Sequence, residues 1–312
     1  MQALWCSMDH ARVKPFSPLK EFLRLQLIKK IGLVLKVGLV LDILLTWRLV
    51  EEALLMAKDL MLGPIMIVKL THIVSNFLLR LIFHLLYIPK FSIIDRVDTT
   101  FENIQITAPP TSPNTDGIHI GSSTGIKIFS SSIATGDDCV SIGPGTDNLL
   151  VSGLACGPGH GISIGSLGRY PNEADVTNLV IQNCNISGTS NGVRIKTWAP
   201  SPPSNVYNVT FENIGMNNVD NPIIIDQQYC PFETRKCGNG ASSQVQIRNV
   251  KFNNIYGTSK NKVAVELKCS PSKPCGELSL TNINLNFPGG ATSSCSNAYG
   301  TATGREQPPA CI

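Results

Sequence analysis

Residues 114–120 read NTDGIHI, residues 136–142 read GDDCVSI and residues 159–165 read GHGISIG. Each stretch is a polar cluster next to glycine, followed by a short alternation of apolar and polar residues that is typical of a strand. The three stretches begin 22 and 23 residues apart. A repeat of this length indicates a solenoid in which each period forms one coil.

Equal steps also separate the ionisable residues of these stretches. Asp116, Asp138 and His160 follow one another at intervals of 22 residues. If each interval is one coil, equivalent positions stack at the spacing of neighbouring strands, about 4.8 Å. We therefore expect these three side chains on one ridge, with Asp137 beside them.

Two interleaved series of short strands continue this pattern from about Phe91 to near the C-terminus. The first series consists of residues 103–106, 125–128, 148–151, 178–181, 208–211, 249–252 and 277–280. The second consists of residues 117–120, 139–142, 161–164, 192–195, 222–225 and 263–266. Two such series with loops of variable length predict an all-β fold, a right-handed parallel β-helix over residues 91–312. A β-sandwich is the alternative, but it requires hairpin turns and gives no coil-to-coil register.

Residues 1–90 are rich in Leu, Ile and Val with interspersed charges, a composition that favours helices over strands. We therefore expect an apolar, helical N-terminal segment, which is either a cap on the solenoid or a segment of non-native origin. Charged residues interrupt both apolar runs, 18–62 and 65–88, so no membrane span is expected. Residues 1–17 lack the basic start and unbroken apolar stretch of a secretory signal.

The net charge of +4 is distributed unevenly along the 312 residues. Residues 1–95 hold 12 of the 26 Lys and Arg and 7 of the 22 Asp and Glu, so the repeat region is close to neutral. The basic balance therefore gives no reason to expect a nucleic-acid partner for the repeat region.

Nine of the ten cysteines lie after residue 95, and eight of these nine form close pairs in the sequence. The pairs are Cys139 with Cys156, Cys230 with Cys237, Cys269 with Cys275, and Cys295 with Cys311. Short-range pairs in a loop-rich chain suggest disulfides and an oxidising compartment. Metal ligation is the alternative, but no Cys-x-x-Cys or paired-His spacing supports it. Cys184 is left over and is expected to be buried, and Cys6 belongs to the N-terminal segment.

The adjacent carboxylates Asp137 and Asp138 point to opposite faces of an ideal strand, so both serve one site only where the chain bends. Gly136 permits such a bend. Crowding raises the proton affinity of one carboxylate, which gives a general acid beside ionised groups that can act as a base. Inverting glycoside hydrolysis needs about 6.5 to 9.5 Å between acid and base, a separation that neighbouring coils can provide. A turn or Asx cap is the alternative for any single Asp here.

Residues 191–196 read NGVRIK and place Arg194 and Lys196 on the same side of one strand. With the two intervening apolar residues facing inward, both cations face the ridge that carries the acids. Arg can bind a carboxylate through two hydrogen bonds and Lys adds a point charge, which suits a polymer with a carboxylate on each sugar. A solvated strand face is the alternative.

The motifs Asn114-Thr115-Asp116, Gly136-Asp137-Asp138, Gly159-His160-Gly161 and Arg194-Ile195-Lys196, in this order, resemble those of the polygalacturonases, family 28 of the glycoside hydrolases. The resemblance covers residues 91–312. It implies a right-handed parallel β-helix without metal or cofactor. It also implies inverting hydrolysis of α-1,4-galacturonosyl linkages in pectin, in cell-wall remodelling.

The resemblance also implies a role for each matching residue. By position, these are Asp137 as general acid, Asp116 and Asp138 as activators of the water, His160 in holding the protonation state, Arg194 and Lys196 on the sugar carboxylate, and Tyr229 in contact with substrate. Residues 165–170, GSLGRY, are similar to the plant exo-acting branch of the family.

The resemblance further implies a monomer, secreted to the extracellular space or cell wall, with polygalacturonate or pectin as its partner. Family members carry a signal peptide and several more coils before the Asn-Thr-Asp motif, and residues 1–90 resemble neither, so N-terminal coils are expected to be missing. Two alternatives follow: a truncated, inactive pectin-binding homologue, or a calcium-dependent pectin lyase-type enzyme with the Asp cluster as oxygen ligands.

Overall fold

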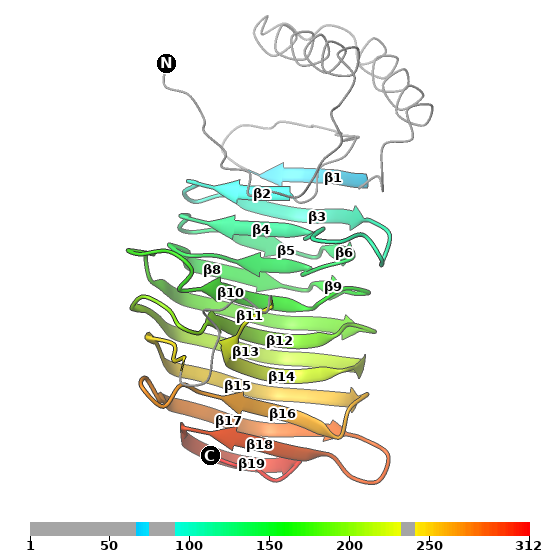
Figure 1. The fold of residues 1–312 in the computed structure, drawn as a ribbon. Helices are drawn as coiled ribbons and strands as arrows, with labels where there is room; N and C mark the ends of the chain where they lie inside the picture. The colour runs from blue at the N-terminus through cyan, green and yellow to red at the C-terminus, as the bar shows by residue number, and fades with distance from the viewer. Residues whose placement is uncertain (1–66, 75–90, 232–240) are drawn as a thin grey trace, which may run out of the picture. The chain divides into compact units, whose positions relative to one another are not determined.

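The structure, a computed structural model, describes residues 67–74, 91–231 and 241–312 (Figure 1). Every helix or strand assigned within these ranges is a β-strand, and the strands belong to two sheets. Among these residues there is no helix long and apolar enough to cross a membrane. The all-β prediction for residues 91–312 is therefore confirmed for the described part of the chain.

The chain passes back and forth between the two sheets as it advances, and the strands stack one above another in Figure 1. The first sheet has 11 strands, β1 (Ile67–Val74), β3 (Thr100–Thr107), β5 (Lys127–Phe129), β6 (Ser132–Ala134), β8 (Asp147–Ser152), β9 (Ala155–Cys156), β11 (Val176–Ser187), β13 (Ser204–Val219), β15 (Val245–Ser259), β17 (Cys275–Asn286) and β19 (Ala298–Gln307). The second has eight, β2 (Phe91–Ile94), β4 (Ile118–Gly121), β7 (Val140–Ile142), β10 (Ile162–Leu167), β12 (Asn191–Trp198), β14 (Asn221–Tyr229), β16 (Val263–Lys268) and β18 (Thr292–Ser296). Neighbouring strands are parallel throughout except at β1, so the chain forms a parallel β-helix.

Columns of buried aliphatic side chains fill the space between the sheets. One column in the second sheet consists of Ile118, Val140, Ile162, Val193, Ile223 and Val265, each in register with the next. A parallel column two positions later consists of Ile120, Ile142, Ile164, Ile195, Ile225 and Leu267. Full burial of each such side chain stabilises the fold by about 1.5–3 kcal/mol. A slip of one residue would turn a whole strand's apolar side chains outward, so the core fixes where the intervening polar residues lie.

Asparagines mark the bends of the long strands. Asn178 and Asn208 both adopt positive φ, 58° in each case, in a region that Asn tolerates better than most residues. Their side chains form a ladder on the outside, in which Asn208 Nδ2 donates to Asn178 Oδ1 at 2.5 Å. A second ladder runs from Asn254 through Asn213 to Asn183 at 2.7 and 3.2 Å. These bends explain why so many of the predicted strands begin with Asn.

One part of the predicted helical segment is a strand. Residues 67–74 form β1, which pairs antiparallel with β3, so the helix prediction is wrong for these eight residues. Five of them are β-branched, Ile67, Val68, Thr71, Ile73 and Val74, and such residues favour strands. The edge of β3 opposite β5 and β6 would otherwise have unpaired backbone groups, and β1 covers it. Residues 1–66 and 75–90 lie outside the described residues.

Three of the predicted disulfides are confirmed: Cys139–Cys156, Cys269–Cys275 and Cys295–Cys311. Cys184 is a buried free thiol, as expected, and burial raises its pKa to about 11. Cys6 and Cys237 lie outside the described residues, so the pairing of Cys230 with Cys237 stays a prediction.

Candidate active site

The 22-residue steps of the sequence correspond to single coils. Asp116, Asp138 and His160 each stand two residues before a strand of the second sheet, β4, β7 and β10 respectively. These strands pair in register, and the N–H of Gly117 donates to the carbonyl oxygen of Asp138 at 2.8 Å. The three residues therefore occupy equivalent positions on adjacent coils, as the period predicted.

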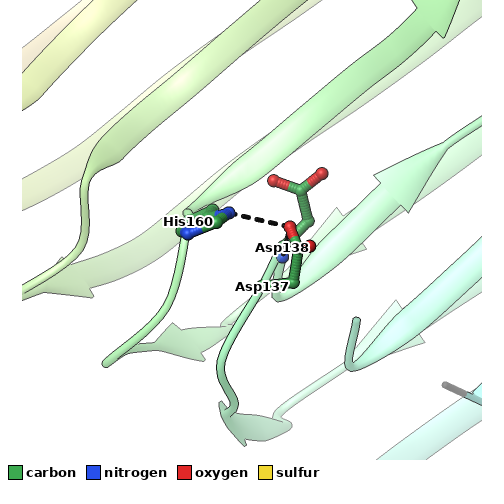
Figure 2. Close-up of side chains that lie close together, drawn as sticks. All are labelled: Asp137, Asp138 and His160. Atoms are coloured by element: carbon green, nitrogen blue, oxygen red, sulfur yellow. Dashed lines mark hydrogen bonds and ion pairs between the residues drawn. The ribbon is translucent and has the colours of Figure 1, made fainter. Parts of the chain in front are cut away.

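The chain bends after Gly136, and the bend lets the two adjacent carboxylates serve one site. A Cβ on Gly136 would lie 2.0 Å from the backbone oxygen of Ser112, so only glycine fits here. Oδ1 of Asp137 accepts the backbone N–H of Asp138 at 2.8 Å. Ligand atoms of Asp137, Asp138 and His160 all lie within 4.8 Å of one another, and Figure 2 shows the three side chains converging.

Asp137 and His160 form an ion pair, with His160 Nδ1 2.8 Å from Asp137 Oδ1 (Figure 2). Burial alone would raise the pKa of Asp137. The net shift is downward, because His160 lowers this pKa through its hydrogen bond and its charge, and the Lys196 charge and the Asp138 N–H lower it further. The hydrogen bond to Asp137 raises the pKa of His160 against the effect of its burial, and the charges of Asp137 and Asp138 raise it further. The proton of this pair therefore lies on the imidazole over a wider pH range than in free histidine.

Asp138 is buried and accepts three hydrogen bonds. Its Oδ1 accepts from Ser163 Oγ at 2.7 Å and Arg194 Nη2 at 2.8 Å, and its Oδ2 accepts from Lys196 Nζ at 2.9 Å. Only 13% of the Arg194 side chain and 9% of the Lys196 side chain are exposed, so these cations are not a solvated strand face. The structure brings both cations to the acids, as expected, but directs them to Asp138.

Two serines form hydrogen-bond relays that the sequence interpretation missed. Ser141 Oγ donates to Asp116 Oδ2 at 2.9 Å and lies 2.7 Å from His119 Nδ1. Because the single hydroxyl hydrogen goes to Asp116, His119 donates from Nδ1. One coil further, Ser163 donates to Asp138 and accepts from Arg194 Nε at 2.9 Å. His119, Ser141, Ser163 and Arg194 occupy one register position on β4, β7, β10 and β12, the outward position between the two buried columns. Their polar identity at that position was visible in the sequence.

Tyr229 ends β14 next to the two cations. Its ring centroid lies 5.5 Å from Lys196 Nζ and 5.6 Å from the Trp198 ring, which meets it edge-on. Burial raises the pKa of Tyr229, and the nearby aspartates raise it further against the lowering effect of Arg194. All seven predicted site residues therefore lie on consecutive coils, and Trp198 joins them as a residue that the sequence interpretation did not select.

Family membership follows from the sequence that builds this site. Residues 87–304 match the family described as Glycosyl hydrolases family 28. The chain belongs to this family. All four motifs lie inside the matched residues, so the family resemblance seen in the sequence is confirmed.

Plant members of glycosyl hydrolase family 28 are among the similar proteins. An exopolygalacturonase of Platanus acerifolia is 50% identical over 220 residues, which cover 70% of this chain and 58% of that protein. An exopolygalacturonase of Arabidopsis thaliana is 51% identical over 223 residues, covering 70% and 50%. The solved polygalacturonase of Erwinia carotovora ssp. carotovora has 30% identity and a TM-score of 0.54, covering 69% and 53%. The chain thus spans about half the length of the curated relatives it matches.

The family 28 site could offer three ligand atoms to a metal ion, one each from Asp137, Asp138 and His160. Both oxygens of Asp138 already accept from Arg194 and Lys196, and His160 holds an oxygen of Asp137. A divalent cation would have to lie beside two fixed positive charges, which is electrostatically unfavourable. The arrangement suits acid–base chemistry better than metal coordination.

Proposed function

We propose that this protein hydrolyses α-1,4-galacturonosyl linkages of polygalacturonate or pectin with inversion at the anomeric carbon. The ion pair of Asp137 with His160, beside the buried and doubly ion-paired Asp138, is the observation that carries the proposal. The substrate class is supported by the relatives, which are named as polygalacturonases and exopolygalacturonases.

Asp137 acts as the general acid, with His160 as its proton reservoir. The raised pKa of His160 and the lowered pKa of Asp137 favour the proton of the pair on His160. The proton passes to the leaving glycosidic oxygen through Asp137 as the bond between that oxygen and the anomeric carbon breaks. Such a relay keeps a proton available where a lone carboxyl with a lowered pKa would have lost it. The imidazole is reprotonated from solvent afterwards.

Asp116 accepts the proton of the attacking water. The water oxygen bonds to the anomeric carbon on the face opposite the leaving oxygen, which inverts the configuration. Asp138 assists as a fixed negative charge, because its oxygens are already committed to Ser163, Arg194 and Lys196. The family resemblance implied that Asp116 and Asp138 both activate the water. In this assignment Asp116 takes the proton and Asp138 supplies only its charge.

The two cations of the site, Arg194 and Lys196, favour an anionic sugar. Asp137 and protonated His160 cancel, whereas Arg194 and Lys196 together face the single carboxylate of Asp138. With Asp116 ionised as the base, these six groups sum to about zero, so attraction of a uronate carboxylate is local to the positive charges of Arg194 and Lys196. The proposal also includes a right-handed coil, action as a monomer and secretion to the cell wall. The three disulfides support an oxidising compartment.

Incubation of the full chain with polygalacturonate, with and without EDTA, tests the proposal. We expect new reducing ends and saturated products in equal amounts under both conditions. Unsaturated products that disappear with EDTA would instead identify a calcium-dependent lyase. Binding of the polymer without any product would identify the pectin-binding homologue, and absence of both binding and products would refute the substrate class.

A further inference from the structure

Arg169 lies on the loop that follows β10, beside the ring of Trp198, which is two residues after Lys196 on β12. Its guanidinium has no carboxylate within 4 Å among the described residues, whereas Arg194 and Lys196 are both paired with Asp138. We propose that Arg169 binds a second uronate carboxylate, on a sugar adjacent to the one held at the acids. This inference rests on the proposed function and deepens it.

The backbone that carries Arg169 is held in place by Glu173. One carboxylate oxygen of Glu173 accepts the N–H of Gly168 at 2.6 Å, and the other accepts those of Arg169 and Tyr170 at 2.9 Å each. Gly168 has φ of +76°, and a Cβ there would lie 2.5 Å from that of Ser201. A carboxylate that accepts three backbone donors fixes the loop, while the Arg169 side chain stays exposed.

The aromatic rings of Tyr170 and Trp198 lie against the guanidinium of Arg169. Its central carbon lies 5.3 Å from the ring centroid of Tyr170 and 5.7 Å from that of Trp198. A guanidinium above a ring face is attracted by the π electrons and keeps its N–H edges available for other partners. Those edges match the two oxygens of a carboxylate.

The Trp198 ring also connects Arg169 with Lys196, one of the two cations at the acids. Trp198 follows Lys196 by two residues on β12, and its ring meets Tyr229 at 5.6 Å. Tyr229 in turn lies 5.5 Å from Lys196 Nζ. Alternate residues of a strand share a face, so Trp198 lies on the same face of β12 as Lys196. Arg169 reaches this face through its contact with the Trp198 ring.

This geometry predicts recognition of two consecutive uronates. A polymer with a carboxylate on every sugar can place one charge near Lys196 and the next near Arg169. A chain whose neighbouring sugar is uncharged or esterified loses the second contact. Arg169 touches no reacting atom, so it acts on substrate affinity and specificity.

The test compares Arg169→Ala and Arg169→Gln with Arg248→Ala. Arg248 is a matched control because it is also exposed and lies 5.8 Å from a tyrosine ring, that of Tyr207, but on β15 of the other sheet. We expect both Arg169 variants to raise KM for polygalacturonate and the Kd for trigalacturonate about tenfold or more, with kcat nearly unchanged. Arg248→Ala should match the parent, and methyl-esterified trigalacturonate should bind the parent and the Arg169 variants equally weakly.

The outcomes separate this inference from the proposed function. A parent protein that hydrolyses polygalacturonate, with Arg169 variants indistinguishable from Arg248→Ala, would overturn the role of Arg169 alone. A parent that neither binds trigalacturonate nor hydrolyses the polymer would overturn the proposed function and the inference with it. Arg169→Gln keeps most of the side-chain volume, so a loss seen in both variants cannot be assigned to misfolding of Arg169→Ala.

Discussion

Ser141 donates its hydroxyl hydrogen to Oδ2 of Asp116 across 2.9 Å, although 25 residues separate the two in sequence. The contact repeats one coil further on, where Ser163 donates to Asp138, also 25 residues earlier. The same three-residue unit, a donor, a serine and an aspartate, therefore occurs on two successive coils. His119 donates to the serine of the first unit, and Arg194 donates to the serine of the second. The first unit orients the proposed base, and the second holds a fixed charge.

Removing the first unit should impair turnover more than binding. Ser141→Ala is expected to lower kcat about tenfold, because Asp116 loses a donor that fixes its orientation toward the water. His119→Asn should retain most of the activity, since the Asn amide N–H can replace Nδ1–H, whereas His119→Gln should not. Steady-state kinetics on polygalacturonate would measure this difference.

Ser132→Ala provides the control, because Ser132 is exposed on β6 of the other sheet. Equal kcat values for Ser141→Ala and Ser132→Ala would rule out an orienting role for Ser141. Equal kcat values for the Asn and Gln variants of His119 would show that the donated hydrogen is not what matters.

Asp137→Asn should lower turnover by at least about a hundredfold, the usual scale of general acid–base catalysis. Asp138→Asn should lower turnover by a similar factor, because it removes the fixed negative charge beside the reacting groups. Their stabilities should differ. Asp138→Asn leaves Arg194 and Lys196 largely buried without a negative partner, and breaking such a pair costs about 3–5 kcal/mol. Asp137→Asn removes a partner only from the half-exposed His160 and should unfold close to the parent.

Turnover assays and chemical denaturation of the two aspartate variants would measure both effects. Retention of most activity by either variant would remove its catalytic assignment. Equal free energies of unfolding would show that the ion pairs of Asp138 contribute little to folding.

The ion pair of Asp137 and His160 predicts the pH range of the enzyme. The hydrogen bond to Asp137 raises the pKa of His160 above its ordinary value of 6.5, so the reserve proton should persist above that pH. His160→Ala leaves the proton to Asp137 alone, and the alkaline limb of kcat/KM should therefore move to lower pH. An unchanged alkaline limb in this variant would contradict the proton-reservoir role.

The same shifts give the pair's effect on stability. The pKa of Asp137 is lowered from 3.8, so its contribution is present above that value and is lost as the pH falls through the lowered pKa. The pKa of His160 is raised, so its contribution is present below 6.5 and is lost as the pH rises through the raised pKa. Thermal unfolding of the parent and His160→Ala should differ most between these limits and converge outside them.

The sequence period was sufficient to predict the coil and the stacking of Asp116, Asp138 and His160, because residue spacing and strand register are linked directly in a solenoid. The ion pairs of Asp138 were not predictable in this way. They join residues 56 and 58 positions apart, on coils that are not adjacent, and they depend on the reach of long side chains. The strand β1 was missed because its neighbours in sequence are rich in Leu, and the edge of β3 that it covers is visible only in the fold.

Substrate charge gives the last prediction. The repeat region is close to neutral in sequence, so general attraction cannot select a polyanion, and recognition has to be local to individual cations, Arg194 and Lys196 at the acids and the proposed Arg169. Removing one partner of a buried charge pair costs about 2–5 kcal/mol, so Lys196→Ala should weaken the use of polygalacturonate by tens-fold or more. Lys251→Ala, exposed on β15, should match the parent.

Fully methyl-esterified polymer separates loss of recognition from loss of structure in Lys196→Ala. Esterification removes the charge on the substrate, so the parent should use this polymer poorly. Lys196→Ala should add little to that loss if Lys196 acts on the sugar carboxylate, whereas damage to the Asp138 ion pair would lower activity on both polymers by the same factor. Equal use of esterified and free polymer by the parent would remove the carboxylate role, and with it most of the case for polygalacturonate over a neutral glycan.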